Sequence, residues 1–108
     1  MKLLALEHER TGATARDFEP HLRGEARHVW ELQQQGIVRE IYFRPDQHTA
    51  VLILECADLE AGQAILAGFP LVRHGLIRFE LMPLAPYPGF ARLFQSPDLD
   101  DRMAGGSR

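Results

Sequence analysis

The sequence predicts an α+β, ferredoxin-like fold, in which a four-stranded antiparallel sheet carries two helices on one face. Three observations support it. Four short segments alternate or run continuously in hydrophobic residues, two longer segments repeat them every three or four residues, and turn residues separate them in the order βαββαβ. At 108 residues the chain is long enough for one domain and too short for two. We expect this domain at residues 1–94, including a C-terminal arm, and a disordered tail at residues 95–108.

The first strand and the first helix are expected in the N-terminal third of the chain. Lys2–His8 is a compact apolar run, and the turn-like residues 10–14 follow it, which predicts a short strand and a loop. A long amphipathic helix is then expected from near Asp17 to Gly36. Pro20 fits this helix only in its first turn, because proline has no backbone N–H to donate. The expected buried stripe comprises Phe18, Leu22, Ala26, Val29 and Leu32.

The remaining elements follow from the same two periods. Ile37–Arg44 and Thr49–Cys56 flank the turn residues 45–48 and predict a β-hairpin. Asp58 is placed to cap a second, shorter helix that ends near Gly68. Gly75–Leu84 alternates as a fourth strand, and prolines at positions 83, 86 and 88 prevent regular pairing beyond it.

Two strands are apolar on both faces, although two helices can cover only one side of the sheet. Residues 3–6 and 50–54 are consecutively apolar, and the predicted topology makes these strands the central pair. We expect a second copy of the chain to cover the other face, which makes a homodimer the minimal unit, arranged as a dimeric α+β barrel. Pro83–Phe94 is too apolar for a solvated tail, and we expect this arm to reach the partner subunit.

Composition narrows the class of protein. The net charge of -3 and the absence of a basic stripe argue against nucleic acid as a partner. The single cysteine, Cys56, reads as a small buried hydrophobic residue in a reducing compartment, so we expect a cytoplasmic protein. The N-terminal segment lacks the pattern of a signal peptide, and no apolar stretch approaches the roughly 20 residues that span a bilayer.

Catalytic candidates lie on the first helix. Nucleophile-elbow, P-loop and dinucleotide motifs are missing, which favours proton transfer on a small carbon acid. His21, Glu25 and His28 are spaced four and three residues apart and therefore lie along one side of the helix. Glu25, with His28 beside it, is a candidate base, and the alternative is a solvated flank in which Glu25 pairs with arginines. The histidine spacing does not favour a metal site.

Substrate-binding candidates follow from the strands. Arg39 alternates with Ile37, Ile41 and Phe43, so an arginine among apolar neighbours would be placed to hold a substrate carboxylate. The alternative is an ion pair with a partner subunit or with Glu55. Tyr42 is a polar residue of the same strand, and Trp30 on the first helix is either a substrate contact or a core or interface residue.

Several segments together resemble the muconolactone delta-isomerase family. Residues 34–36 read Gln-Gln-Gly and lead into the strand with Arg39, and residues 66–71 read Leu-Ala-Gly-Phe-Pro-Leu before the last strand. The resemblance covers about residues 20–87. It implies a small oligomeric enzyme that moves a proton along the carbons of an unsaturated lactone with no metal or organic cofactor. Glu25 lies where the family carries a glutamate on its first helix, so the resemblance implies Glu25 as proton shuttle and Arg39 as carboxylate clamp.

The chain departs from the family after its last strand, where an aromatic arm replaces a short polar end. The same fold also hosts cofactor-free monooxygenases of aromatic compounds, haem enzymes and proteins without catalysis. A monooxygenase and a non-catalytic ligand-binding or assembly protein therefore remain alternatives to the isomerase.

Overall fold

The computed structural model describes residues 1–95. Its elements begin with β1 (Lys2–Glu9), α1 (Ala15–Phe18), the 3₁₀ helix η1 (Glu19–His21), α2 (Leu22–Gln34) and β2 (Val38–Arg44). They continue with β3 (Thr49–Glu55), α3 (Leu59–Ala67), α4 (Pro70–Arg73), β4 (Ile77–Leu84) and the 3₁₀ helix η2 (Pro88–Phe94). The four strands lie within one or two residues of their predicted positions.

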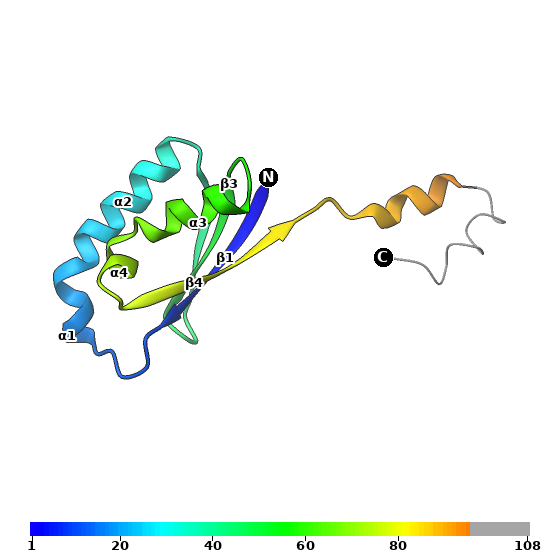
Figure 1. The fold of residues 1–108 in the computed structure, drawn as a ribbon. Helices are drawn as coiled ribbons and strands as arrows, with labels where there is room; N and C mark the ends of the chain where they lie inside the picture. The colour runs from blue at the N-terminus through cyan, green and yellow to red at the C-terminus, as the bar shows by residue number, and fades with distance from the viewer. Residues whose placement is uncertain (96–108) are drawn as a thin grey trace.

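The sheet has the predicted topology. Its strand order is β2-β3-β1-β4, and every neighbouring pair is antiparallel. The central pair is β1 and β3, the two strands that are apolar at consecutive positions. Figure 1 shows α2 and α3 on one side of this sheet. The ferredoxin-like α+β prediction is confirmed.

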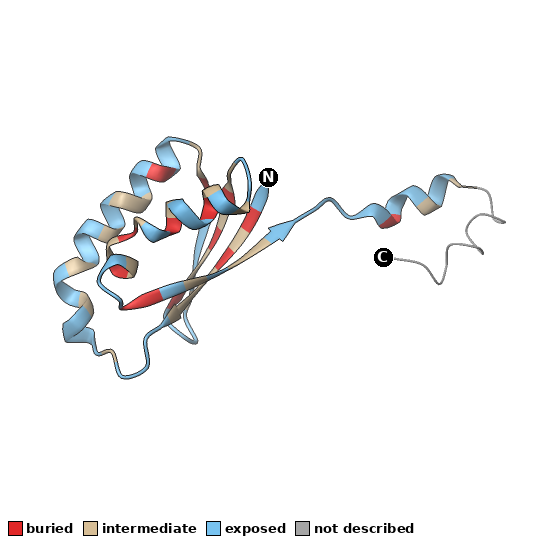
Figure 2. Cartoon of the chain, viewed as in Figure 1, coloured by how far each residue is buried: buried red, intermediate tan, exposed pale blue. Residues whose placement is uncertain are grey.

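The core lies between the sheet and the two long helices. Leu3, Ala5, Leu52 and Leu54 are fully buried on the sheet, and Phe69, only 1% exposed, packs against them from the segment after α3. Each large side chain of this kind stabilises the fold by roughly 1.5–3 kcal/mol when it leaves water. The buried positions concentrate on the central strands and the helix faces above them (Figure 2).

The first helix is interrupted rather than continuous. One α-helical turn, α1, is followed by η1 and only then by α2. Pro20 sits in η1, near its start. Because Pro20 has no N–H, it cannot donate the α-helical hydrogen bond to the carbonyl four residues earlier. The predicted single helix therefore divides at the proline.

A β-bulge in β2 corrects the predicted face of Arg39. Val38 pairs with Leu54 and Glu40 with Ile53, so the register shifts between them. The shift puts Val38, only 1% exposed, on the same face as Ile41 and Phe43. Strict alternation from Ile37 predicted Arg39 on that face. The bulge inserts one extra residue into the strand, so residues on its two sides no longer follow a single alternation.

The second helix begins and ends as predicted. The Asp58 side chain accepts a hydrogen bond of 2.7 Å from the Ala61 N–H, and Gly68 follows the last helical residue. A short helix, α4, was not predicted between α3 and β4. Pro70 begins it, and four residues are too few for a hydrophobic period to reveal.

The face of the sheet opposite the helices carries a half-buried apolar patch. It comprises Leu4, Leu6, Val51, Ile53 and Met82, which neighbour one another across β3, β1 and β4.

Beyond β4 the chain leaves the body as an extended arm ending in η2 (Figure 1). Tyr87, Phe90, Leu93 and Phe94 on this arm are all more than half exposed. The predicted disordered tail lies outside the described residues, apart from Gln95. Within residues 1–95 no helix combines the length and apolar character needed to cross a membrane.

Candidate active site

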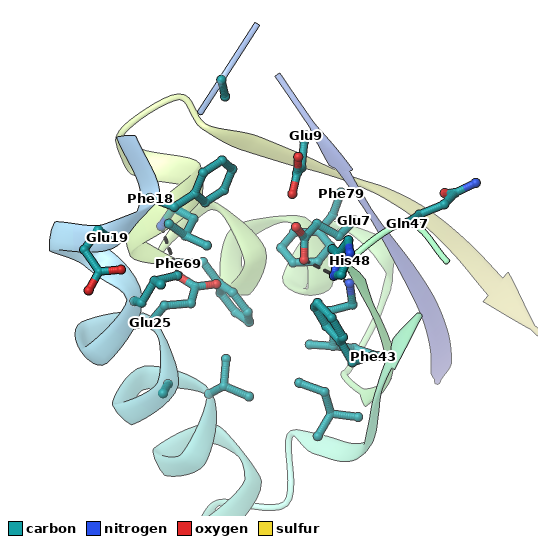
Figure 3. A pocket seen from close by; sticks show the side chains of 18 of the residues that line it. Glu7, Glu9, Phe18, Glu19, Glu25, Phe43, Gln47, His48, Phe69 and Phe79 are labelled. Carbon is teal, nitrogen blue, oxygen red and sulfur yellow. Dashed lines mark hydrogen bonds between the residues drawn. The ribbon is translucent and has the colours of Figure 1, made fainter. Parts of the chain in front are cut away.

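A cavity of about 860 Å³ lies between the helical layer and the sheet. Its size falls in the range of roughly 300–1,000 Å³ that is usual for small-molecule sites. Figure 3 shows the cavity with α2 on one side and the strands on the other. Much of its wall is aromatic, formed by Phe18, Trp30, Phe43, Phe69 and Phe79. Such walls suit a small ring or another flat apolar molecule.

Glu25 projects from the first turn of α2 into this cavity (Figure 3). Its Oε1 accepts a hydrogen bond of 3.0 Å from the Leu71 N–H of α4. Burial raises the pKa of the Glu25 carboxyl, the Leu71 N–H partly lowers it, and the negative charge of Glu7 raises it again. The arrangement holds a proton-accepting carboxylate in one orientation and makes it more basic than an exposed glutamate.

A second carboxyl, Glu7, faces the cavity from β1. Glu7 lies on the helix side of the sheet, two residues after the buried Ala5, and its Oε1 accepts a hydrogen bond of 3.0 Å from the Ala50 N–H. Burial raises the pKa of Glu7, the Ala50 N–H opposes the shift, and the negative charge of Glu9 adds to it. Two half-buried carboxyls from different elements therefore share one apolar cavity.

The rim of the cavity adds further polar groups. Glu9 and Glu19 are exposed and line it, as does His48 at the end of the β2–β3 turn. His48 adopts a φ of 56°, in the left-handed region that non-glycine residues seldom occupy. Among the described residues that line the cavity there are four glutamates and one histidine, but no lysine or arginine.

The structure brings together only some of the predicted site residues. Glu25 and Trp30 both line the cavity, and Trp30 is 60% exposed at its edge. His28 is not among the lining residues. Its ring meets Phe69 edge to face with centroids 5.1 Å apart, and its buried Nε2 has no hydrogen-bond partner.

Arg39 and Tyr42 lie outside the cavity lining. The Arg39 Nε donates a hydrogen bond of 2.6 Å to the Gly36 carbonyl, beside the bulge in β2. The Tyr42 hydroxyl donates to Glu40 Oε1 at 2.7 Å, and Tyr42 pairs with Val51 on the face opposite the helices. In the single chain neither residue is placed to touch a ligand in the cavity.

Sequence reasoning missed Glu7, Glu9 and His48. One signal was available for Glu7, because Leu3, Ala5 and Glu7 alternate on a strand whose inward face is otherwise apolar. An acidic residue at an inward position requires a partner or a function. His48 had no such signal, since a turn residue gives no indication of its direction.

No group of three or more histidine, cysteine or acidic side chains within residues 1–95 is arranged to hold a metal ion.

Comparisons with known proteins agree with the predicted resemblance. The sequence model of muconolactone delta-isomerase matches residues 6–89, which is most of the chain. The chain belongs to the muconolactone delta-isomerase family. No curated protein matches it significantly by sequence. This family membership supports a role in small-molecule chemistry.

A solved structure shares the fold. The 5-chloro-2-hydroxyhydroquinone dehydrochlorinase of Burkholderia phenoliruptrix, in complex with 2,5-dihydroxybenzoquinone, aligns with a TM-score of 0.57 at 14% identity. The alignment covers 79% of this chain and 94% of the dehydrochlorinase chain. At this identity the similarity concerns the fold.

Proposed function

We propose that the protein is a cofactor-free enzyme that moves a proton along the carbon skeleton of a small unsaturated lactone or enol, in the manner of a muconolactone isomerase. The observation that carries this proposal is the Glu25 carboxyl, which lies in an apolar cavity and is oriented by the Leu71 N–H. Membership of the isomerase family supports the same reaction class.

The chemistry requires one carboxylate beside the ring. Glu25 would remove a proton from the α carbon of a β,γ-unsaturated lactone, or from the γ carbon of an α,β-unsaturated one, and either loss gives the same dienolate. The same carboxyl would then return the proton to the other of these two carbons, so the double bond moves and no net proton is gained or lost. A raised pKa makes the ionised form a stronger base, which favours the first step.

Roles for the other predicted residues follow from their positions. Trp30 is a proposed substrate contact, because it lines the cavity. His28 remains the alternative base on the same helix. The single chain offers no support for Arg39 or Tyr42 as substrate-binding residues, since neither lines the cavity.

The assembly is also a proposal. We propose that a second copy covers the apolar patch of Leu4, Leu6, Val51, Ile53 and Met82, and that the arm over residues 83–94 packs on the partner. A cytoplasmic location is inferred from the single cysteine, Cys56, which is free in the structure.

The test compares Glu25→Gln with His28→Leu, using α-angelica lactone as probe. This neutral lactone isomerises to the conjugated β form by a proton shift, which NMR follows directly. Glu25→Gln keeps the acceptor for the Leu71 N–H and should lower turnover by roughly 10²- to 10⁴-fold. His28→Leu should retain turnover. The opposite pattern would transfer the role to His28, and isomerisation unaffected by either change would refute both assignments.

A second candidate is an enzyme that acts on a hydroxylated aromatic ring, including a cofactor-free monooxygenase. The aromatic cavity wall favours it, and the dehydrochlorinase with the same fold is named for a chlorinated hydroxyhydroquinone. Oxygen consumption with hydroquinone would support this candidate over the isomerase. Binding of lactones and quinols without turnover of either would instead favour a non-catalytic ligand-binding protein.

A further inference from the structure

Within residues 1–95 the carboxylates that line the cavity face no lysine or arginine, and His48 is the one other ionisable side chain in its wall. Glu7 and Glu25 are half-buried in its wall, Glu9 and Glu19 stand at the rim, and no lysine or arginine lines it within residues 1–95. A bound carboxylate would therefore meet like charges with no cation to offset them. The repulsion between a bound carboxylate and the wall is strongest at Glu7 and Glu25, because solvent screens half-buried charges less than exposed ones.

We propose that the cavity selects uncharged lactones or enols, that Glu7 excludes carboxylate-bearing molecules, and that Glu7 accepts a hydrogen bond from a hydroxyl or enol of the bound molecule. This inference rests on the proposed function and specifies its substrate class. It differs from the expected role of Arg39 as a carboxylate clamp, because the Arg39 Nε donates a hydrogen bond to the Gly36 carbonyl and the side chain lies outside the cavity lining.

The position of Glu7 allows both roles. The Ala50 N–H occupies one lone pair of its carboxylate and fixes the side chain against β3, which leaves acceptor capacity toward the cavity. Figure 3 shows the Glu7 side chain directed into the same space as Glu25 and Glu9. The aromatic walls supply apolar contact for a ring without adding a cation.

The direct experiment measures binding, so it does not depend on turnover. Muconolactone, which carries a carboxylate, and its uncharged methyl ester are titrated against the full-length protein at pH 7 and low salt by calorimetry. The ester should bind roughly tenfold tighter or more, the scale expected for one ionised glutamate within about 7 Å. Equal affinity, or tighter binding of the carboxylate, would overturn the proposal.

Variants separate the local effect from the overall charge. Glu7→Gln keeps an oxygen that can accept from the Ala50 N–H. The ratio of the dissociation constants of muconolactone and its methyl ester should fall by about threefold or more in this variant, as expected for loss of a partly screened charge. Glu60→Gln changes the net charge equally on α3, away from the cavity lining, and should leave the preference unchanged. Identical behaviour of the two variants would show that Glu7 is not the selective group.

Three further outcomes bear on the selectivity or on the proposed reaction. Homoserine lactone carries an ammonium group, and its tighter binding than the methyl ester would show a cation-selective cavity and overturn the proposal. Failure of every lactone to bind would do the same. Preferential binding of the ester without isomerisation would contradict the proposed reaction and leave the charge selectivity standing.

Discussion

Two helical glycines lie in opposite surroundings, and they test how closely the helical layer packs on the sheet. Gly62 in α3 is buried, and a methyl group added there would overlap the Leu3 side chain and come within 3.2 Å of Leu81 Cδ2. Gly24 in α2 is exposed, with no atom within 4 Å of an added methyl group. Substitution of each by alanine therefore has a different expected sign.

The magnitudes follow from two opposing effects. Alanine is favoured over glycine inside a helix by about 0.8–1 kcal/mol. A methyl group forced into a close-packed core costs about 1–3 kcal/mol. Leu3 is fully buried, so its side chain cannot move aside into solvent to make room. Gly62→Ala should therefore lower the free energy of unfolding by about 0–2 kcal/mol, whereas Gly24→Ala should raise it by up to about 1 kcal/mol.

Urea denaturation monitored by circular dichroism measures both variants against the parent protein. The dependence of the free energy on urea should stay the same, so that a shift in midpoint reports stability alone. A Gly62→Ala protein that is more stable than the parent protein would refute the close contact between α3 and β1.

Two further predictions concern charge and assembly. Because burial raises the pKa of Glu25 in the folded state, the parent protein should lose stability as pH rises from the ordinary glutamate pKa through the raised value. Glu25→Gln removes this titrating group, so the melting temperature of the variant should fall less between pH 4.5 and 8. An equal fall in melting temperature in the two proteins would contradict the effect of burial on Glu25. Val51→Lys on the open sheet face should give a smaller species by light scattering than the parent protein, and identical masses would exclude that face as the contact between copies.

The sequence was most informative where one residue pattern has one structural solution. Consecutive apolar residues at 3–6 and 50–54 required central strands, and these are β1 and β3. The sequence was least informative where a β-bulge changes which residues of a strand face the helices. The bulge in β2 moved Val38 rather than Arg39 onto the helix side, and no residue near it announces a bulge. From the residues alone, the carboxylate clamp expected of Arg39 rested on strict alternation along β2, whereas the family resemblance implied the same role separately.

Glu25 was predicted from its spacing on the first helix and from the family resemblance, and its orientation in the structure depends on a segment far away in the sequence. The residues 69–71, Phe-Pro-Leu, form part of the family resemblance, and the structure gives each a separate task. Phe69 is buried and contributes to the cavity wall. Pro70 begins α4 and fixes its first turn, where backbone N–H groups have no partner within the helix.

Leu71 supplies one of these N–H groups, and the Glu25 carboxylate accepts it at 3.0 Å. The short segment after α3 and the glutamate on α2 are therefore one structural unit, in which the N–H of a helical turn orients a carboxyl. This coupling explains why a motif 46 residues away from Glu25 carries information about the same site. It also means that a substitution at Pro70, which does not itself line the cavity, should disturb the orientation of the Glu25 carboxyl.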